Sequence, residues 1–392
     1  MAKLTIKECD FKGKTVLMRA DFNVPLDSAL AITDDTRIRE TIPTIKYILD
    51  NGAKKLVLMS HLGRPDGKRV DKYSLRPVAM RLENLLSEPV NFLNDCVGPD
   101  IKKQVQTCKE RVVLLENLRY HSEEESNDQA FAKDLAGLGD VFVNDAFGTA
   151  HRAHASTAGV DNFLKSAAGF LLEKEIKYLG AALEKPARPF AVILGGAKVS
   201  DKIGVIDNLL PKCDTIIIGG GMAYTFLKAQ GKEIGNSKLE KDKIDIAKKI
   251  LEKAASLKKQ ILLPVDHVVV DKVDPSSPVQ VVDEIPEGKI AVDIGPKTIK
   301  LFGDVLRSSQ TVVWNGPLGV FEMDPFSVGT KEIALLLAGI KATTIIGGGD
   351  TAAAVAKFNL QNKMTHISTG GGASLEFLEG KVLPGIAALS DL

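Results

Sequence analysis

The sequence is poor in cysteine and has no long apolar segment. Its four cysteines form no C-x-x-C pair, so their spacing predicts neither a zinc site nor a disulfide framework. The N-terminus M-A-K-L-T-I-K-E-C-D lacks the apolar core of a signal peptide, and no apolar run approaches the length of a membrane span. On these grounds we expect a cytoplasmic protein.

An excess of charge of either sign is also missing. The 51 Lys and Arg residues nearly balance the 50 Asp and Glu residues, for a formal net charge of +1. This balance gives no reason to expect nucleic acid or an acidic membrane surface as a partner. A hydrophobic content of 44% and a charged content of 26% are typical of a globular protein. The length predicts about two to three domains.

Both common nucleotide-binding fingerprints are absent. No G-x-x-x-x-G-K-[ST] occurs, since the segment Gly13-Lys14-Thr15 lacks the upstream glycine. No G-x-G-x-x-G occurs either, because Tyr224 stands where the last glycine would be needed after the triplet at 219–221. These absences exclude a P-loop enzyme and an ordinary dinucleotide-binding dehydrogenase.

What the sequence does contain is a repeated order of strand, polar loop and helix. In the first half, short apolar segments predict strands at 15–18, 55–59, 111–115 and 141–143. Segments with helical spacing run from Arg37 to Gly52, over 75–86 and over 131–138. This order implies parallel strands with helices on both faces of the sheet.

The second half repeats the order, with glycine after most strands. The predicted strands are 190–194, 215–218, 311–314, 343–346 and 366–368. A helix predicted over 171–183, followed by Pro186 and Pro189, marks the boundary. We therefore expect an α/β protein with two doubly wound, Rossmann-like parallel-sheet domains, 1–170 and 190–378, joined by a hinge helix and link at 171–189.

Ligands bind at the carboxyl ends of the strands in such sheets, and in the first half these ends carry polar side chains. They are Asp21, Asn23, His61, Arg64, Arg119 and Arg152, with Arg37 at the start of a helix beside them. Four arginines and a histidine would repel one another unless an anion joined them, and guanidinium groups suit phosphate and carboxylate geometry. The pattern predicts a small, multiply charged substrate, although any one arginine alone is more typical of an ordinary surface position.

Other polar residues of the first half give weaker evidence for a binding site. We expect His61 to donate a hydrogen bond to the anion. His151 and His154 are three residues apart, but no third ligand shares the stretch, so a metal site there is disfavoured. The acidic run 123–125 is interpreted as a solvated turn.

The second half opens with F-A-V-I-L-G-G-A-K-V-S-D-K-I at 190–203. Its apolar start predicts a buried strand, and its two glycines a sharp turn into a helix. Lys198 and Lys202 are four residues apart, so we expect them on one face of that helix. Two cations in the first turns of a helix are poorly placed unless an anion binds there. A pair of solvated lysines is the alternative.

Three glycine triplets follow later strands, at 219–221, 347–349 and 370–372. Triplets of this kind remove side chains where the backbone approaches something closely, and they predict a nucleotide lying along amides and helix N-termini. Asp350 is the natural magnesium ligand, as a hard oxygen donor beside those amides. The alternative is that Asp350 caps a helix over 351–358.

Ordered motifs over most of the chain resemble the phosphoglycerate kinase family. They are R-A-D-F-N-V-P, D-D-T-R-I-R-E, S-H-L-G-R-P, L-L-E-N-L-R-Y, N-D-A-F-G-T-A-H-R-A-H-A-S, G-G-A-K-V-S-D-K, W-N-G-P-L-G-V-F-E and G-G-G-D-T, between residues 19 and 351. The ending L-P-G-I-A-A-L-S also fits. Ala20 and the segment 26–31 depart from the family pattern, but no carried-over functional position lies there.

The resemblance implies an N-terminal domain that holds 3-phosphoglycerate and a C-terminal domain that holds Mg²⁺ with ATP or ADP. It implies reversible phosphoryl transfer between 1,3-bisphosphoglycerate and ADP, by direct in-line transfer on domain closure, in a cytoplasmic monomer. It also implies that the tail 379–392 returns to the N-terminal domain. Neither nucleic acid nor a membrane is implied as a partner.

The resemblance also implies roles for individual residues. For the glycerate these are Asp21, Phe22, Asn23, Arg37, His61, Leu62, Gly63, Arg64, Arg119 and Arg152. For the nucleotide they are Lys198, Lys202, Gly219, Asn315, Glu322, Gly348, Gly349, Asp350 and Thr351, with Asp350 also the metal ligand. For catalysis they are Arg37, Lys202, Gly348 and Gly371.

The implied chemistry agrees with the residues, since a carboxylate acceptor is already ionised at pH 7 and needs no general base. Catalysis would rest on positioning and on stabilising charge in a loose transition state. Two other classes are disfavoured. A non-catalytic two-domain anion-binding protein does not account for the glycine triplets, and a hydride-transfer enzyme would need the missing fingerprint.

Overall fold

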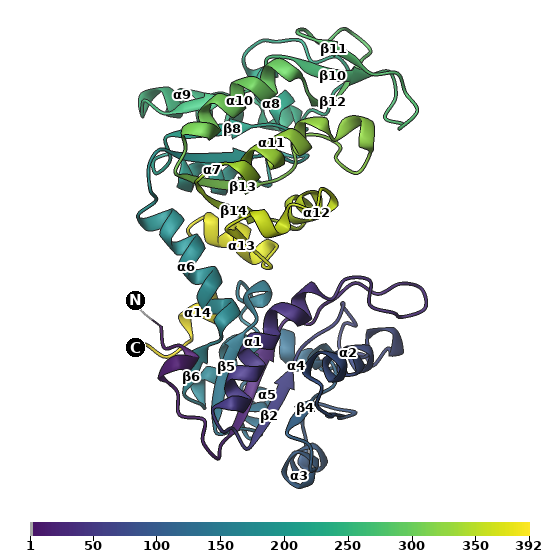
Figure 1. Ribbon diagram of the computed structural model, residues 1–392, viewed down its shortest axis with the longest axis vertical. Coiled ribbons are helices and arrows are strands. Elements are labelled where there is room, and N and C mark those ends of the chain that lie inside the picture. Colours follow the sequence, from purple (N-terminus) through teal and green to yellow (C-terminus); the bar gives the residue numbers. More distant parts are fainter. Residues whose placement is uncertain (1–2) are drawn as a thin grey trace. The chain divides into compact units, whose positions relative to one another are not determined.

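The computed structural model describes residues 3–392, which divide into two compact units. One unit comprises the residues up to Lys177 together with Val382–Leu392, and the other comprises Tyr178–Lys381. Each unit is built on a six-stranded parallel sheet with flanking helices (Figure 1). Among the described residues, no helix has both the length and the apolar character needed to cross a bilayer.

The sheet of the first unit has the strand order β3-β4-β2-β1-β5-β6, and every pairing is parallel. Its strands are β1 (Thr15–Ala20), β2 (Lys55–Met59), β3 (Val90–Phe92), β4 (Val112–Leu114), β5 (Val141–Asp145) and β6 (Ser166–Ala168). Parallel order forces each connection to cross over the sheet, which places helices between consecutive strands. The polar segments after β1, β2, β4 and β5 therefore gather at one edge of the sheet.

Alternation along the strands divides the first unit into two apolar layers. Val16 and Met18 pack in a core with the apolar side chains of α1 (Thr36–Asp50) and α2 (Arg76–Leu86). Leu17, between them in sequence, packs with α3 (Pro99–Thr107) and α5 (Gln129–Ala136) on the other face. Successive side chains of a strand point to opposite faces, so both faces are covered, as the sequence predicts.

The second unit has the strand order β15-β14-β13-β7-β8-β9, again entirely parallel. Its strands are β7 (Phe190–Leu194), β8 (Thr215–Ile218), β9 (Gln260–Leu262), β13 (Thr311–Asn315), β14 (Thr343–Gly347) and β15 (His366–Ile367). Trp314 is fully buried in a core formed with α10 (Pro296–Ser308), α11 (Val328–Gly339) and α12 (Gly349–Lys357). The other helices of this unit are α7 (Ile203–Leu209), α8 (Ala223–Ala229), α9 (Ile244–Ser256) and α13 (Gly372–Leu378).

Several elements have no counterpart among the sequence-based predictions. β3, β6 and β9 have only three residues each, too few to show an alternating pattern. A separate antiparallel sheet of the second unit has the order β11-β10-β12, formed by β10 (His267–Val270), β11 (Gln280–Val282) and β12 (Ile290–Ile294). It departs from the purely parallel arrangement that the strand–helix order predicts.

The first unit contains residues from both ends of the chain. The helix α6 (Phe170–Glu184) carries the chain out of this unit, and the short helix α14 (Pro384–Ala387) lies in the returning segment (Figure 1). The amide of Leu4 donates to the carbonyl of Ser390 at 2.9 Å, and the amide of Gly385 donates to the carbonyl of Ala150 at 2.9 Å. The last residues thus pack beside the first ones.

Candidate active site

The carboxyl edge of the first sheet brings several predicted substrate residues into direct contact. Asp21 follows β1 and accepts a hydrogen bond from Arg37 of α1 at 2.8 Å. The side-chain oxygen of Asn23 accepts from the amide of Gly63, after β2, at 2.9 Å. Arg119, after β4, donates to the carbonyl of the same Gly63 at 2.8 Å. Loops that follow three different strands are therefore tied together at one place.

The arginines of this edge are only partly balanced by carboxylates. Glu125 lies 3.4 Å from Nε of Arg119 and 4.0 Å from Arg152. Burial lowers the pKa of Arg119 to about 10, which leaves it cationic at neutral pH. Arg64 is exposed beside these groups. The edge therefore keeps a cationic surface of the kind that suits an anion, and the binding of an anion there stays a prediction.

His61 is buried at the same edge, and its pKa is held well below the usual value by burial and by the nearby charges of Arg19 and Arg119. A guanidinium nitrogen of Arg19 lies 3.1 Å from Nδ1 of His61. A guanidinium can only donate, so Nδ1 accepts and Nε2 carries the proton. The neutral ring thus presents an N–H donor, which agrees with the predicted role.

Arg19 was missed by the sequence analysis, and the interpretation of the acidic run 123–125 as a solvated turn is wrong for Glu124. This carboxylate is fully buried in the short helix α4 (Ser122–Glu125), where it accepts from Ser156 Oγ at 2.6 Å and from Ser156 N at 2.9 Å. Nε of Arg19 donates to the same Ser156 hydroxyl at 2.8 Å. An acidic residue is buried here because a serine and a buried arginine, both distant in sequence, compensate it.

Two residues implied as substrate ligands have their side chains in the core. Phe22 and Leu62 are 0% and 3% exposed and belong to an apolar cluster of the first unit. The amide of Phe22 donates to Ser60 Oγ at 2.9 Å, and the carbonyl of Leu62 accepts from Asn117 at 2.7 Å. These residues shape the edge through the backbone.

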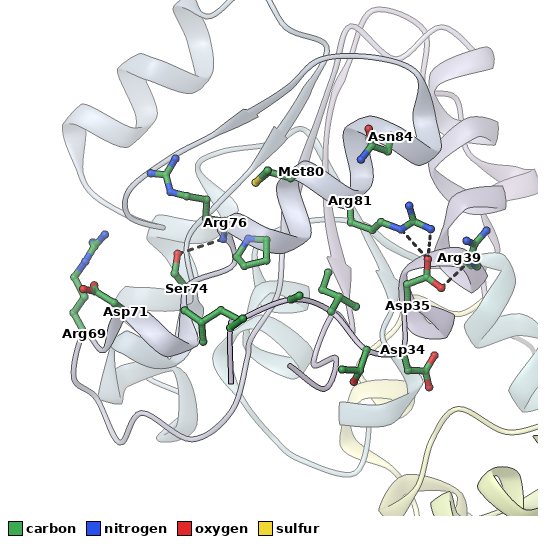
Figure 2. A pocket seen from close by; sticks show the side chains of 16 residues that line it. Asp34, Asp35, Arg39, Arg69, Asp71, Ser74, Arg76, Met80, Arg81 and Asn84 are labelled. Carbon is green, nitrogen blue, oxygen red and sulfur yellow. Dashed lines mark hydrogen bonds and ion pairs between the residues drawn. The ribbon is translucent and has the colours of Figure 1, made fainter. Parts of the chain in front are cut away.

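A cavity of about 970 Å³ in the first unit is a separate hollow between the segment 29–35 and α2. Figure 2 shows Arg39 and Arg81 both reaching the carboxylate of Asp35, with hydrogen bonds of 2.8 and 2.6 Å. The cavity contains none of the predicted substrate residues. Its size alone therefore does not make it the active site.

In the second unit, the predicted helix that carries Lys198 and Lys202 is wrong. The segment after Gly196 is a loop, and α7 begins only at Ile203. The carboxylate of Glu240 accepts hydrogen bonds from the amides of Val199 and Ser200 and from Ser200 Oγ. Because a side chain some 40 positions later in the sequence holds these amides, the helix starts one turn late, with Lys202 as its N-cap residue.

Lys202 nevertheless points to the predicted site. Its Nζ donates to Oδ1 of Asn315, the last residue of β13. Nδ2 of Asn315 is buried and has no hydrogen-bond partner. Burial lowers the pKa of Lys202, while the neighbouring carboxylates of Asp201 and Asp350 oppose that shift. An unpaired buried amide beside a partly desolvated lysine is the arrangement expected where an anionic ligand supplies the missing acceptor.

The glycines of the second unit have two different roles. A Cβ on Gly195 would lie 2.1 Å from the carbonyl oxygen of Pro317, and one on Gly316 would lie 2.2 Å from the carbonyl oxygen of Gly195. These glycines let two loops of the protein pack on each other. A Cβ on Gly196, Gly349 or Gly371 would meet nothing within 4 Å, so these backbones face open space. Gly219 is enclosed, since its Cβ would lie 2.5 Å from Leu318.

Asp350 does not cap a helix, so the alternative of a capping role is wrong. α12 begins at Gly349, its N-cap residue is Gly348, and Asp350 lies exposed in the first turn. Thr351, by contrast, is buried and accepts a hydrogen bond from the amide of Gly316 at 2.7 Å. A carboxylate at the N-terminus of a helix is electrostatically favourable and is free to bind a cation.

Asp350 and Glu322 line the same cavity of about 350 Å³. Its walls include the open loop of Gly196 and the apolar side chains of Tyr224, Leu318 and Val320. Lys238 lines it as well and was missed, because it lies in an irregular loop without a periodic pattern. The cavity combines an apolar wall, glycine-containing loops, a lysine and carboxylates, which suits a nucleotide with a bound cation.

The fold and these two sites define a two-domain α/β protein with a cationic sheet edge in one unit and, in the other, a cavity lined by Glu322 and Asp350. The chain matches the phosphoglycerate kinase family over residues 6–381. It therefore belongs to the phosphoglycerate kinase family.

Individual relatives agree over the full length. The chain is 57% identical over 394 residues to the phosphoglycerate kinase of Pelotomaculum thermopropionicum, covering 100% of both chains. It is 58% identical over 395 residues to that of Clostridium botulinum, covering 99% of both. Among solved structures, the phosphoglycerate kinase of Coxiella burnetii is similar with a TM-score of 0.90 and 42% identity, covering 98% of each chain. That of Pyrococcus horikoshii is similar with a TM-score of 0.85 and 33% identity, covering 98% of each chain.

Proposed function

We propose that the protein catalyses reversible, Mg²⁺-dependent phosphoryl transfer between 1,3-bisphosphoglycerate and ADP, giving 3-phosphoglycerate and ATP. Membership of the phosphoglycerate kinase family supports this activity. The observation that carries the proposal is that one chain of this family has two candidate sites. One is the arginine-rich edge of the first unit, and the other is the pocket of the second unit that Glu322 and Asp350 line.

The arginine edge suits the glycerate. Arg37 and Arg119 already hold fixed positions through Asp21 and Gly63, so they would bind carboxylate or phosphate oxygens with little further loss of side-chain freedom. Exposed Arg64 and the Nε2–H of His61 would add donors. Asp21 and Asn23 would serve by accepting hydrogen bonds and by orienting their neighbours.

The pocket of the second unit suits the nucleotide. Its apolar wall would face the base, and Glu322 is the residue that we place at the ribose. The amides beside Gly349 and the ammonium groups of Lys198 and Lys202 would face the phosphates. Asp350 would hold Mg²⁺, since an exposed carboxylate on the pocket wall is the hard oxygen donor that this ion prefers. When bound, Mg²⁺ would neutralise charge on the nucleotide phosphates.

The transfer itself needs positioning and charge stabilisation. The acceptor is a carboxylate or a phosphate oxygen that is already ionised, so no side chain has to remove a proton. Lys202 would stabilise the transferring group from the nucleotide side, and Arg37 would stabilise it from the glycerate side. Amides of Gly348 and Gly371, both glycines with positive φ at helix N-caps, would add donors.

A coupled assay of ATP formation from 1,3-bisphosphoglycerate and ADP tests the activity. Formation of ATP that depends on both substrates and on Mg²⁺ supports the proposal. Binding of both ligands without turnover would instead favour a non-catalytic anion-binding protein. The monomeric state and the cytoplasmic location stay predictions.

A further inference from the structure

Asp95, Cys96 and His121 form a cluster of metal-ligand side chains outside both sites described above. One donor atom of each residue lies within 4.8 Å of the other two. Within residues 3–392, no other group of three His, Cys, Asp or Glu side chains meets this condition. Its members come from two loops of the first unit that are distant in sequence, so their spacing along the chain shows no metal-binding motif.

Backbone contacts hold the three residues in place. Oδ1 of Asp95 lies 2.7 Å from Nε2 of His121 and accepts from the amide of Cys96, also at 2.7 Å. The amide of His121 donates to the carbonyl of Leu118 at 3.1 Å, and the amide of Glu116 donates to the carbonyl of Asp95. The donor set is therefore preformed, and an ion would not have to organise a flexible loop.

The charges around the cluster favour a cation. Burial, followed by the charges of Asp95 and Glu124, raises the pKa of the Cys96 thiol well above its usual value, and the hydrogen bond to Asp95, followed by the charge of Glu123, raises that of His121. Arg69 is the cation that acts on Asp95, and it lies 3.9 Å from the carboxylate of Glu116. Arg19 compensates Glu124, so Glu123 and Glu116 are the further carboxylates that accompany the guanidinium of Arg69 near the cluster.

The kinds of donor select the ion. A carboxylate oxygen, an imidazole nitrogen and a thiolate sulfur suit Zn²⁺, whereas Mg²⁺ and Ca²⁺ prefer oxygen alone. In a tetrahedral zinc site the donor atoms lie about 3.5 Å apart, as bond lengths of about 2.0–2.3 Å require. The atoms of this cluster, all within 4.8 Å of one another, reach that geometry by shifts of about an ångström.

We propose that Asp95, Cys96 and His121 bind Zn²⁺ through Oδ, Sγ and Nε2, with water as the fourth ligand. The ion would enter from the solvent side, where the side chains of Asp95 and His121 are 51% and 28% exposed, and buried Cys96 would close the site from beneath. On binding, the thiol proton and the proton between Asp95 and His121 would pass to solvent. The ion would tie the loop after β3 to the start of α4.

Cobalt(II), which replaces Zn²⁺ in such sites, gives a direct test. Reduced, metal-free full-length protein titrated with Co²⁺ should show a near-ultraviolet thiolate-to-cobalt charge-transfer band, and stoichiometric Zn²⁺ should remove it. A large excess of Mg²⁺ should leave the band unchanged, because Mg²⁺ does not compete for thiolate.

Variants identify the ligands. Cys96→Ser should abolish the band, and His121→Gln should weaken Zn²⁺ binding by about 100-fold or more, at least the loss that removing an outer-shell partner causes. Cys213→Ser is the matched control, since Cys213 is also buried but lies in the other unit. It should bind Co²⁺ like the unmodified protein.

Cys96→Ala keeps an apolar contact in the core and serves as a second variant if the serine disturbs folding. The proposal is overturned if the unmodified protein gives no charge-transfer band with Co²⁺. It is equally overturned if the band persists in a folded Cys96→Ala variant, which would place the thiolate ligand at another cysteine.

Discussion

A guanidinium nitrogen of Arg19 lies 3.1 Å from Nδ1 of His61, and this contact fixes the ring as neutral with its proton on Nε2. His61 could be neither protonated nor flipped about its ring axis without disturbing Arg19, because both residues are buried. This contact at the cationic edge of the first unit therefore makes the stability of the protein depend on pH.

His61 should make the protein less stable in acid. Burial and Arg19 hold its pKa well below the usual 6.5, so below that pH the unfolded chain binds a proton that the folded chain does not. The stabilisation is complete above about pH 6.5 and falls by about 1.4 kcal/mol per pH unit below it. His61→Gln should remove this part of the slope in urea unfolding between about pH 7 and 5.

His121→Gln is the control of opposite sign. In metal-free protein, the hydrogen bond that Nε2 of His121 donates to Asp95 raises the pKa of His121, so its stabilisation is present in acid and is lost as the pH rises through the folded-state value. The two variants should therefore change the slope of the free energy of unfolding against pH in opposite directions. Parallel shifts would show that His61 is protonated in the folded protein.

Arg64→Ala should weaken binding of 3-phosphoglycerate by about 10- to 100-fold, the loss of a hydrogen bond between charged groups. Binding of ATP should not change, because Arg64 belongs to the first unit. Calorimetric titration of each ligand measures both. Arg39→Ala, which removes an arginine already paired with Asp35, should leave both affinities near normal. An equal loss for ATP would contradict the assignment of two separate sites.

Lys202→Ala should lower turnover by roughly 10²–10³-fold, the effect of losing one preorganised electrostatic donor, while glycerate binding stays near normal. The reason is its hydrogen bond to Asn315 at the carboxyl end of β13, where burial has already removed part of its hydration. Steady-state kinetics with the coupled assay measure this. Lys228→Ala, which removes a lysine paired with Glu233, is the control. Normal turnover of the Lys202 variant would exclude a role at the transferring group.

Asp350→Asn should weaken Mg²⁺-dependent binding of ADP and raise the Mg²⁺ concentration needed for activity. The substitution keeps the shape of the side chain but removes its charge, and it should cost at most about 1 kcal/mol of stability as the lost interaction with the helix dipole. Titration of ADP with and without Mg²⁺ separates the two effects. Unchanged Mg²⁺ dependence would show that Asp350 is not a metal ligand. Asp242→Asn is the control for the loss of an exposed carboxylate.

Closure of the two units should need both ligands. Reacting atoms must come within roughly 3–3.5 Å, so two ligands held by separate units can react only if the units close on both of them. The hinge would lie in the ends of α6, in the link 185–189 and in the returning tail. Small-angle scattering should show a compaction with 3-phosphoglycerate and a nucleotide together that neither gives alone. Full compaction with one ligand would contradict this mechanism.

The parallel sheets and most loops of the site could be predicted from the sequence, because both follow from local patterns. The buried five-residue strand β7 is apolar throughout and β2 is apolar after its first residue, Lys55, and polar or glycine-rich loops follow both strands. The carboxyl ends of parallel strands meet at one edge, so the residues after them could be grouped without coordinates.

What the sequence could not reveal depends on contacts between distant residues. The loop of Lys198 is not a helix because Glu240 occupies its amides. Glu124 is buried because Ser156 and Arg19 compensate it. The tautomer of His61 is set by the guanidinium of Arg19, which donates to Nδ1. Neither periodicity nor a motif indicates that these particular residues contact one another.

The pairing of Leu4 with Ser390 has a consequence for synthesis on the ribosome. Residues of the second unit, 178–381, are all translated before the segment Val382–Leu392 that completes the first unit. The unit that begins first in the nascent chain is therefore the last to obtain all of its native contacts, while the inserted unit can finish earlier. A chain that stops short of Val382 should yield a second unit that resists proteolysis and a first unit that remains susceptible.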